Sequence, residues 1–488
     1  MQFLPCPDNA VGQALITDPR TAAVILTGSL ETARLFQDWR PDLRLFAETS
    51  GKNALIVTAM ADRDQAIKDL VRSAFSHNGQ KCSAASLGIL EAEVYNDPTF
   101  RRQLQDAAAS LAIGSAWDLS NMITPLTQPP SPKLRRALTC LEPGETWLLE
   151  PQPMPLAPGE TRDLETHRLW SPGIKLGVQP GSFFHTTECF GPVLGLMRAE
   201  DVEEAIALAN AVPFGLTGGL HTLDDREIAR WRDEIQIGNA YVNRSITGAV
   251  VRRQPFGGWK ASNVGPGAKA GGPNYVLQLG TWRQVDLPTR QTDPASVVAA
   301  VLERCQHLSS DNHVSALWQA SARSYAWAWH SHYCQEHDPS QILGELNLFR
   351  YRPVRGILVR VEAGTALMSL VQVVLAALTC EAPLTVSLSH DGDDCDWMAD
   401  LSTVQVMVED ETSLIARLSE PDVVYDRLRA LGPLSTTLRR ALNTAGISVV
   451  DVPVLANGRL ELRYYLREQA LSQTVHRYGN VMKTYWQT

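Results

Sequence analysis

The chain has 488 residues and a formal net charge of −9, from 44 lysines and arginines against 53 aspartates and glutamates. This length predicts about two to four domains with ample apolar surface for a core. The acidic balance disfavours nucleic-acid binding, because no basic run is present that could neutralise a phosphate backbone.

The cysteines and the longest uncharged segment indicate a soluble chain. The eight cysteines show no CxxC spacing, which predicts neither a metal site nor a disulfide framework and favours a reducing cytoplasm. The N-terminus lacks the basic and apolar runs of a signal peptide. Residues 363–380 are uncharged but contain four polar side chains between Glu362 and Glu381. They predict a buried crossover helix, since a membrane span needs about 20 mostly apolar residues.

The first predicted elements are a strand, a small-residue turn and a helix. Residues 22–26 are apolar and are followed by Thr27-Gly28-Ser29, and a helical pattern begins at Glu31. Such a turn presents free backbone N–H groups that can bind a phosphate. The three residues alone are a weak signal, because most turns of this kind bind nothing.

The next elements lead to Cys82. Residues 54–57 predict a buried strand, and Asp62 is a plausible N-cap for a helix with apolar residues at helical spacing. Asn78-Gly79 predicts the end of that helix, which places Cys82 in the following turn. If another helix begins at about Ser83, its first N–H groups would favour a thiolate at Cys82.

The rest of the chain alternates strands and helices twice more. Residues 176–237 contain a predicted helix at 201–211, and a strand at 238–243 precedes the Gly-rich stretch 254–273. After a linker at 283–295, a strand at 354–361, a helix at 366–379 and a strand at 384–388 predict a βαβ unit. This unit implies a second doubly wound α/β domain over residues 296–488. The aspartates between 391 and 396 lack calcium-loop spacing and predict a solvated turn.

The two candidate catalytic residues are Glu48 and Cys82, which lie 34 positions apart. A thiolate and a carboxylate are the two protein groups needed to oxidise an aldehyde through a thioester. The thiolate attacks the carbonyl carbon, a hydride leaves to a nicotinamide, and the carboxylate activates the water that releases the acid. A lone cysteine is more often buried filler, so the setting of this pair decides its interpretation.

Four ordered motifs supply that setting. They are 46–53 around Glu48, 79–83 around Cys82, Glu188-Cys189-Phe190-Gly191-Pro192-Val193, and Gln254-Pro255-Phe256-Gly257-Gly258. Together they resemble the aldehyde dehydrogenase superfamily over about residues 1–285. The resemblance implies an α/β fold, with a catalytic domain, a partial Rossmann-type cofactor domain and a second Rossmann-like domain at the C-terminus.

Within the superfamily, the chain resembles L-glutamate γ-semialdehyde (Δ1-pyrroline-5-carboxylate) dehydrogenases. Residues 265–275 are similar to the carboxylate-anchoring loop of that group, and of the aldehyde-oxidising half of bifunctional proline utilization A proteins. Residues 349–353, 467–469 and 476–480 resemble the extra C-terminal domain of their longer members. That domain would be a degenerate structural copy covering the active-site region.

The resemblance assigns the substrate-side roles. Cys82 would be the nucleophile and Glu48 the general base for thioester hydrolysis. Ser83 and the backbone N–H groups of Gly271 and Gly272 would hold the substrate carboxylate, and Phe256 would line the pocket. Leu279 stands where the family usually has an aromatic residue.

The same resemblance implies NAD as cofactor. Gly28 and Ser29 would contact the pyrophosphate, and Gly51 would allow close approach of the nicotinamide. Glu188 would accept a hydrogen bond from a ribose hydroxyl, and Phe190 would pack near the nicotinamide. Preference for NAD over NADP stays open.

Only 47 residues precede Glu48, far fewer than in a complete member of the family. The sequence therefore predicts an N-terminally truncated chain, with 1–47 as the remnant of the NAD-binding domain. The other predicted divisions are a catalytic domain at 48–245, the anchor loop and return segment at 246–285, a linker at 286–295 and a C-terminal domain at 296–488. An upstream flavin-dependent proline dehydrogenase half and a homo-oligomer are the expected partners.

The leading hypothesis is NAD-dependent oxidation of L-glutamate γ-semialdehyde to L-glutamate in proline catabolism. Two alternatives remain. One is a non-catalytic assembly or lid module that binds a partner through exposed strand edges. The other is a dehydrogenase for a different aldehyde.

Overall fold

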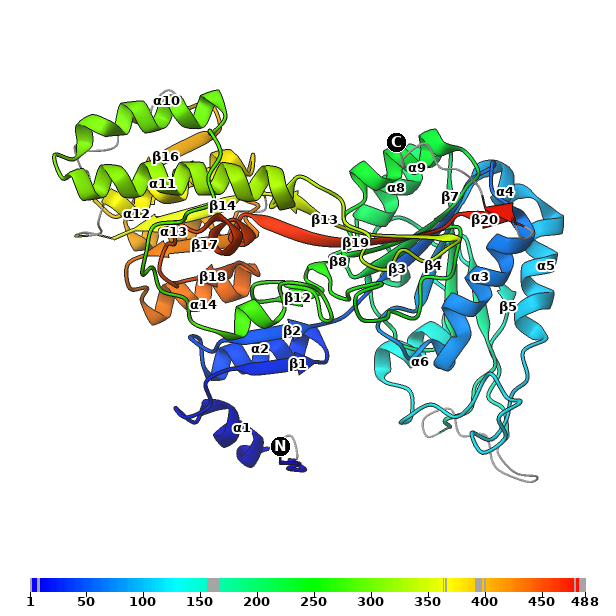
Figure 1. Cartoon of the computed structure of the whole chain (residues 1–488). Coiled ribbons are helices and arrows are strands. Elements are labelled where there is room, and N and C mark those ends of the chain that lie inside the picture. Colours follow the sequence, from blue (N-terminus) through cyan, green and yellow to red (C-terminus); the bar gives the residue numbers. More distant parts are fainter. Residues whose placement is uncertain are drawn as a thin grey trace. The chain divides into compact units, whose positions relative to one another are not determined.

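The computed structural model describes residues 2–6, 9–155, 167–362, 364, 367–390, 397–398, 401–420, 422–477 and 480–481. The chain forms two compact units, each assembled from three separate segments (Figure 1). The first unit comprises Met1–Thr49, Asn263–His337 and Phe349–Glu468. The second comprises Ser50–Ser262, Asp338–Leu348 and Gln469–Thr488. These units interleave along the chain, whereas the domains predicted from the sequence are consecutive.

The second unit is built on a nine-stranded sheet, in which the strands from β19 to β6 pair in parallel and β5 is antiparallel to β6. In spatial order the strands are β13 (Glu345–Pro353), β19 (Leu466–Thr474), β10 (Asn239–Val242), β9 (Thr217–His221), β3 (Asn53–Val57), β4 (Ala85–Glu91), β7 (Val193–Ala199), β6 (Gly173–Leu176) and β5 (Thr146–Leu149). The division between the two units falls within β13 and β19. A smaller ribbon pairs β8 (Phe214–Gly215) with β11 (Trp259–Lys260).

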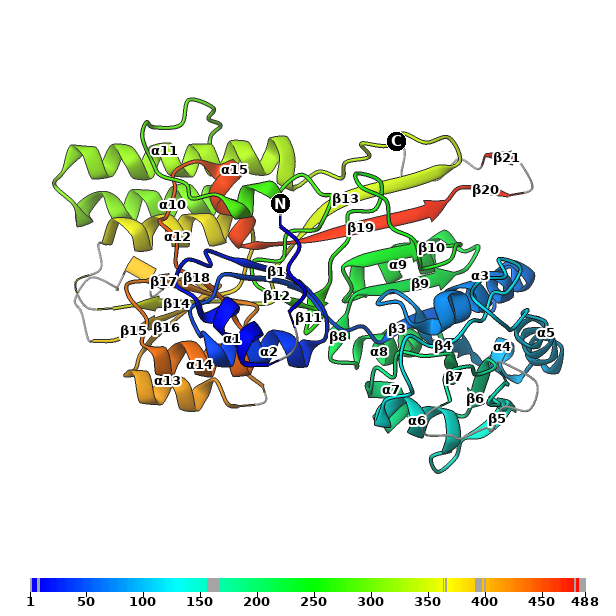
Figure 2. The same cartoon turned by 90° about the horizontal axis from the view of Figure 1, so that it is seen from below.

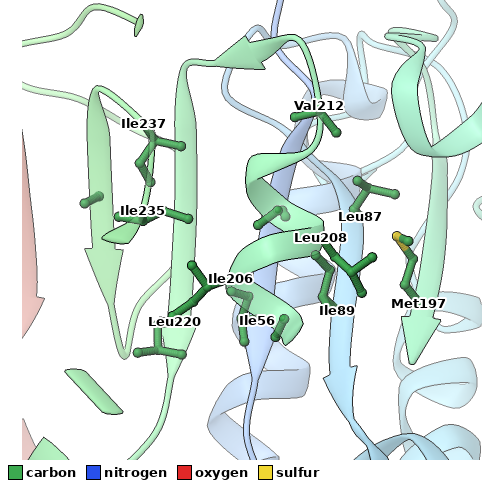
Figure 3. Close-up of a cluster of buried hydrophobic side chains, with 14 of the residues drawn as sticks. Ile56, Leu87, Ile89, Met197, Ile206, Leu208, Val212, Leu220, Ile235 and Ile237 are labelled. Carbon is green, nitrogen blue, oxygen red and sulfur yellow. The ribbon is translucent and has the colours of Figure 1, made fainter. Parts of the chain in front are cut away.

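Helices on both faces explain why the central strands β3, β9 and β10 are buried throughout. The helices of this unit are α3 (Arg63–Phe75), α4 (Ala92–Asn96), α5 (Pro98–Ala109), α6 (Pro132–Thr139), α7 (Phe183–Thr186), α8 (Val202–Asn210) and α9 (Asp225–Glu234). Figure 3 shows Ile206 and Leu208 of α8 over Ile56 of β3 and Ile89 of β4, within one buried cluster. This packing holds the strands whose ends carry the candidate site.

The first unit contains two sheets (Figure 2). The smaller has the order β1 (Val24–Thr27), β2 (Leu45–Glu48) and β12 (Asn263–Val264). The larger is wholly parallel, with the order β16 (Val404–Val408), β15 (Leu384–Leu388), β14 (Ile357–Val361), β17 (Arg427–Leu431) and β18 (Ser448–Val450). Its helices include α1 (Ala10–Thr17), α2 (Leu30–Trp39), α10 (Ser296–Cys305), α11 (Asn312–Ala328), α12 (Leu367–Thr379), α13 (Glu411–Arg417), α14 (Thr436–Ala445) and α15 (Gly458–Glu461).

The larger sheet confirms the predicted doubly wound C-terminal fold. Strand β14 leads through the buried crossover helix α12 to the parallel neighbour β15, and the strand order reverses beside β14 as in Rossmann-type sheets. Among the described residues, no helix is long and apolar enough to cross a bilayer. The acidic turn predicted at 391–396 lies outside the described residues.

The helix considered at about Ser83 does not form, because a strand begins at Ala85 instead. Asp62 does cap α3, accepting the Gln65 N–H at 3.3 Å, but after Cys82 the chain turns and enters β4 at Ala85. Strand β4 pairs with β3 on one side and β7 on the other, and this pairing overrides local helical preference. Because the turn leads into a strand, no helix N-terminus in this segment stabilises a thiolate at Cys82.

We expect two aliphatic truncations in the second unit to lower the free energy of unfolding by very different amounts. Ile56→Ala should lower the free energy of unfolding by about 2–5 kcal/mol, because Ile56 is 1% exposed in the cluster of Figure 3. Val251→Ala, at a side chain 71% exposed, should change it by less than about 0.5 kcal/mol. Urea unfolding of both variants is the measurement, and equal losses would contradict the assigned core.

Candidate active site

The site residues predicted from the sequence are divided between the two units, and each group is described separately. The first unit carries Gly28, Ser29, Glu48, Gly271 and Gly272. The second unit carries Gly51, Cys82, Ser83, Glu188, Phe190 and Phe256.

In the second unit, the turn that carries Cys82 is fixed through its backbone. The Asn53 side chain, at the start of β3, donates to the carbonyls of Cys82 at 2.7 Å and Ala84 at 2.9 Å. The Thr217 hydroxyl donates to the Ser83 carbonyl at 3.3 Å, and its N–H donates to Asn53 Oδ1 at 3.0 Å. Two neighbouring strands thus hold the turn, while the Cys82 side chain stays half-buried.

The segment before Cys82 is a left-handed turn. His77, Asn78 and Gly79 all have positive φ, between 56° and 65°. The Asn78 side chain stabilises this conformation, since its Oδ1 accepts the Thr124 N–H at 2.8 Å. A Cβ on Gly79 would lie 2.2 Å from the Gly191 carbonyl oxygen, so only glycine allows this approach. The turn is therefore locked to the segment that contains Glu188 and Phe190.

Gly51 is the point where the predicted catalytic and cofactor residues meet. Its N–H donates to Glu188 Oε1 at 2.8 Å. A Cβ added to it would lie 2.7 Å from the Cys82 carbonyl oxygen. The structure thus brings Gly51, Cys82 and Glu188 together, as the motif order implied.

Phe190 has a strained backbone beside this point. Its φ is 58°, an unusual value for an aromatic residue, and its side chain is 44% exposed. Its carbonyl accepts a hydrogen bond from the Gln80 side chain at 3.4 Å. A strained, exposed aromatic residue next to the Cys82 turn is typical of a residue positioned for a ligand rather than for packing.

Phe256 is placed by a buried residue that sequence analysis missed. The Asn239 side chain, on β10, donates to the Pro255 carbonyl at 3.0 Å and accepts the Gly257 N–H at 3.1 Å. It therefore grips the backbone on both sides of Phe256. The signal available in the sequence was only an asparagine in an otherwise apolar strand.

A buried lysine, Lys52, adds positive charge to this region. Burial lowers its pKa to about 8, and the nearby Cys189 and Glu188 partly oppose that shift. Its Nζ lies 4.0 Å from the centre of the Phe184 ring and has no hydrogen-bond partner in the described part of the chain. The neighbouring Lys175 pairs with Glu145 at 2.8 Å. Lysines at such positions favour negative charge on nearby groups.

In the first unit, Glu48 is the last residue of β2. Strand β1 pairs with β2 so that Thr27 lies opposite Glu48, and the Gly28 N–H donates to the Glu48 carbonyl at 3.2 Å. Ser29 is the N-cap of α2, where its Oγ accepts the Thr32 N–H at 3.2 Å. The predicted strand, turn and helix are confirmed here. Their contact with a pyrophosphate stays a prediction.

The predicted anchor loop, residues 265–275, follows β12 directly. Gly271 has a φ of 73°, which suits glycine. The Gly272 N–H donates to the Lys269 carbonyl at 3.0 Å, closing a turn. A carboxylate bound at this N–H would therefore have to replace or share that hydrogen bond.

Two residues of the C-terminal sheet and one residue of β19 hold the anchor loop in place. The Arg427 side chain donates to the Pro266 carbonyl at 2.9 Å, and the Ser448 hydroxyl donates to the Gly265 carbonyl at 2.8 Å. Glu468 Oε2 accepts the Lys269 N–H at 2.7 Å. This support was not foreseen from the sequence, because these residues lie more than 150 positions from the loop.

The fold and these motifs define an α/β protein with a cysteine turn set against a glycine and a glutamate. The sequence profile of the aldehyde dehydrogenase family matches residues 1–285. This match covers more than half of the 488 residues, and the chain belongs to the aldehyde dehydrogenase family. The resemblance stated from the motifs is thereby confirmed.

Individual relatives are similar over the same part of the chain. The 1-pyrroline-5-carboxylate dehydrogenase of Bacillus subtilis (strain 168) is 32% identical over 285 residues, which are 57% of this chain and 53% of that protein. The 1-pyrroline-5-carboxylate dehydrogenase of Geobacillus sp. (strain WCH70) is 31% identical over 287 residues, with the same coverage. The chain thus spans about half the length of the curated relatives it matches.

One solved structure resembles nearly the whole chain. Proline utilization A (PutA) from Corynebacterium freiburgense is 40% identical, with a TM-score of 0.80 over 97% of this chain and 44% of that one. The similarity therefore extends through the C-terminal sheet, which the family profile does not reach.

The close packing at Gly51 yields a second testable prediction. Gly51→Ala should lower the free energy of unfolding by about 1–3 kcal/mol, because the new methyl group displaces the Cys82 turn. The displaced Cys82 should also react faster with iodoacetamide, measured by peptide mass spectrometry against the exposed Cys140 in the same sample. Gly280→Ala is the control, since its Cβ would meet nothing closer than 3.8 Å. Unchanged stability and Cys82 labelling in Gly51→Ala would contradict this packing.

Proposed function

We propose that this chain carries out the NAD-dependent oxidation of L-glutamate γ-semialdehyde to L-glutamate through a thioester on Cys82. The observation that carries the proposal is the packing of the Cys82 turn and Glu188 on Gly51. The curated relatives named 1-pyrroline-5-carboxylate dehydrogenase support the choice of substrate.

Cys82 performs the first half of the reaction. Its sulfur forms a bond to the aldehyde carbon, and the carbonyl oxygen takes on the negative charge. As that charge returns to form the carbonyl again, the hydrogen on carbon departs with its electron pair and leaves a thioester. The fixed backbone of the turn keeps Cys82 in place during both steps, because the Asn53 and Thr217 side chains hold the carbonyl oxygens of Cys82 and Ser83.

Glu48 performs the second half. Its carboxylate takes a proton from a water molecule, whose oxygen then bonds to the thioester carbon. The carbon–sulfur bond breaks, the acid leaves, and Cys82 is regenerated as a thiolate. A positioned general base of this kind contributes about 10²–10⁴-fold in rate.

The residues of the second unit fit a dinucleotide. When bound, NAD accepts the hydride of the first half-reaction. The Glu188 carboxylate is fixed by the Gly51 N–H and would accept a hydrogen bond from a ribose hydroxyl, and the missing Cβ at Gly51 lets the Cys82 turn pack against this point. Phe190 is exposed beside it, as expected for a nicotinamide contact.

The anchor loop accounts for a substrate that carries its own carboxylate. The backbone turns at the positive φ of Gly271, and the Gly272 N–H, which donates to the Lys269 carbonyl, would be shared with a bound carboxylate. Ser83 and Phe256 would complete the substrate contacts. A proline dehydrogenase half that supplies the semialdehyde is the partner consistent with the likeness to proline utilization A.

The nucleophile assignment is tested by Cys82→Ala. The parent chain, as it stands and joined to the N-terminal half of the Bacillus subtilis relative, should reduce NAD when given the semialdehyde, and the variant should not. Cys140→Ala is the matched control, because Cys140 is exposed and has no part in the proposed chemistry. Equal oxidation by parent and Cys82→Ala would show the assignment to be wrong.

The base assignment is tested by Glu48→Gln in rapid-mixing experiments. The variant should form about one equivalent of NADH in a first burst, since attack by Cys82 does not need the carboxylate. Steady turnover should then fall by about 10²–10⁴-fold, because thioester hydrolysis lacks its base. Loss of the burst together with turnover would contradict a role confined to hydrolysis.

A further inference from the structure

A small polar cavity lies beside the anchor loop, within the first unit. Its walls come from the loop, from the residues just after it and from the C-terminal domain, and its polar lining includes Asn274, Gln278, Arg463 and Glu468. The cavity has about 20 Å³ of space for the centres of water molecules, and one water needs about 10–15 Å³ by this measure. It is therefore sized for water and not for a metabolite.

Three polar atoms of the lining residues are buried and have no hydrogen-bond partner among the residues that the structure describes. They are Asn274 Oδ1, Gln278 Oε1 and Arg463 Nη1. Native proteins pair nearly all of their buried polar atoms, either with other protein atoms or with ordered water. Two acceptors and one donor that belong to the same small cavity therefore call for a common partner.

We propose that this cavity binds one water molecule, which accepts a hydrogen bond from Arg463 Nη1 and donates to Asn274 Oδ1 and Gln278 Oε1. Buried waters typically make about three hydrogen bonds, and these three atoms supply that number. The water links the C-terminal domain, which carries Arg463, to the anchor loop and to the 3₁₀ turn that follows it at Val276–Leu279.

The orientation of the Asn274 amide is set by its other partners. Its Nδ2 donates to Glu468 Oε1 at 2.7 Å and to the Tyr351 hydroxyl at 2.9 Å. Turning the amide over would set Asn274 Oδ1 against the Glu468 carboxylate, oxygen against oxygen. Oδ1 is therefore the atom that remains for the water, and it can only accept a hydrogen bond.

The Arg463 guanidinium is held so that one of its nitrogens remains for the water. Its Nε donates to the Leu460 carbonyl at 3.0 Å, and its Nη2 donates to the Tyr464 hydroxyl at 2.7 Å. The Arg463 carbonyl accepts Arg427 Nη1 at 2.7 Å, and Arg427 Nη2 donates to the Pro266 carbonyl at 2.9 Å. The donor Nη1 therefore has a defined place next to the anchor loop.

The charges around the cavity argue against an ion as its occupant. Arg427 and Arg463 line the cavity and disfavour a metal cation, while Glu468 and the two acceptor oxygens disfavour an anion. Among the described residues, no group of three His, Cys, Asp or Glu side chains could hold a metal ion. A neutral molecule that both donates and accepts hydrogen bonds is required, and water fits the space.

The water also bears on the predicted carboxylate site, and this consequence rests on the proposed function. Glu468 Oε2 accepts the Lys269 N–H at 2.7 Å, and the Lys269 carbonyl accepts the Gly272 N–H at 3.0 Å. A path of hydrogen bonds thus runs from the water through Asn274 and Glu468 to the glycine turn. By fixing Asn274, the water helps to position the turn that would bind the substrate carboxylate.

A crystal structure of the whole chain tests the water site directly and needs no variant. At a resolution that shows ordered water, one density peak should lie about 2.7–3.2 Å from Arg463 Nη1, Asn274 Oδ1 and Gln278 Oε1. Direct hydrogen bonds among these three side chains, or no peak between them, would overturn the proposal.

A double-mutant cycle measures the same link in solution. Gln278→Met and Arg463→Met each remove one partner of the water, so each should lower the urea midpoint. Together they should lower it by less than the sum, because the first loss already releases the water. The control cycle pairs Gln278→Met with Arg459→Met, since Arg459 Nη1 is also buried and unpaired among the described residues but does not line the cavity. The control should be additive, and additivity in both cycles would overturn the proposal.

Steady-state kinetics separate the effect on the carboxylate site from the water site itself. Gln278→Met should raise the KM for the semialdehyde by about 2–10-fold, the equivalent of one hydrogen bond, and leave kcat unchanged. The KM for hexanal, which has no carboxylate, should stay the same. A chain that oxidises no aldehyde would refute the proposed function, and the crystal structure and the cycle would still decide the water site. In an active chain, equal changes in KM for both aldehydes would overturn the link to the carboxylate site.

Discussion

The site of the second unit depends on a close approach that only a residue without a side chain permits. At Gly51, the N–H is used by the Glu188 carboxylate, and the space that a Cβ would occupy is filled by the Cys82 carbonyl oxygen. The turn that carries Cys82 and the Glu188 side chain therefore cannot move independently. The left-handed turn at His77, Asn78 and Gly79 fixes the same two segments a second time, through Gly191.

Two buried lysines, Lys52 and Lys269, carry positive charge into the interior of the two units. Lys52 lies beside Glu188 and Cys189 in one unit, and Lys269 is acted on by Glu48 and Glu468 in the other. In both cases burial disfavours the ammonium and nearby acidic groups restore part of it. Such an arrangement is costly for stability alone, and it is typical of places where protonation matters for chemistry.

The C-terminal sheet and strand β19 both contact other parts of the chain, including the predicted anchor loop. Arg427, Ser448 and Glu468 hold the anchor loop, and residues 470–473 of β19 pair with β10 in the sheet of the second unit. A domain with the strand order of a dinucleotide-binding fold thus serves as support for a loop. The likeness to proline utilization A extends over nearly the whole chain, including this domain.

The sequence by itself determined the elements with local signals and the order of the catalytic motifs. Asp62 caps its helix as its side chain predicts, and the βαβ unit through α12 was recognisable from its apolar runs. Only the tertiary structure decided that Cys82 leads into a strand, because the pairing of β4 with β3 and β7 is not encoded in neighbouring residues. It also decided the roles of Asn53, Asn239, Lys269 and Glu468, whose partners are distant in the chain and whose burial removes water as the alternative partner.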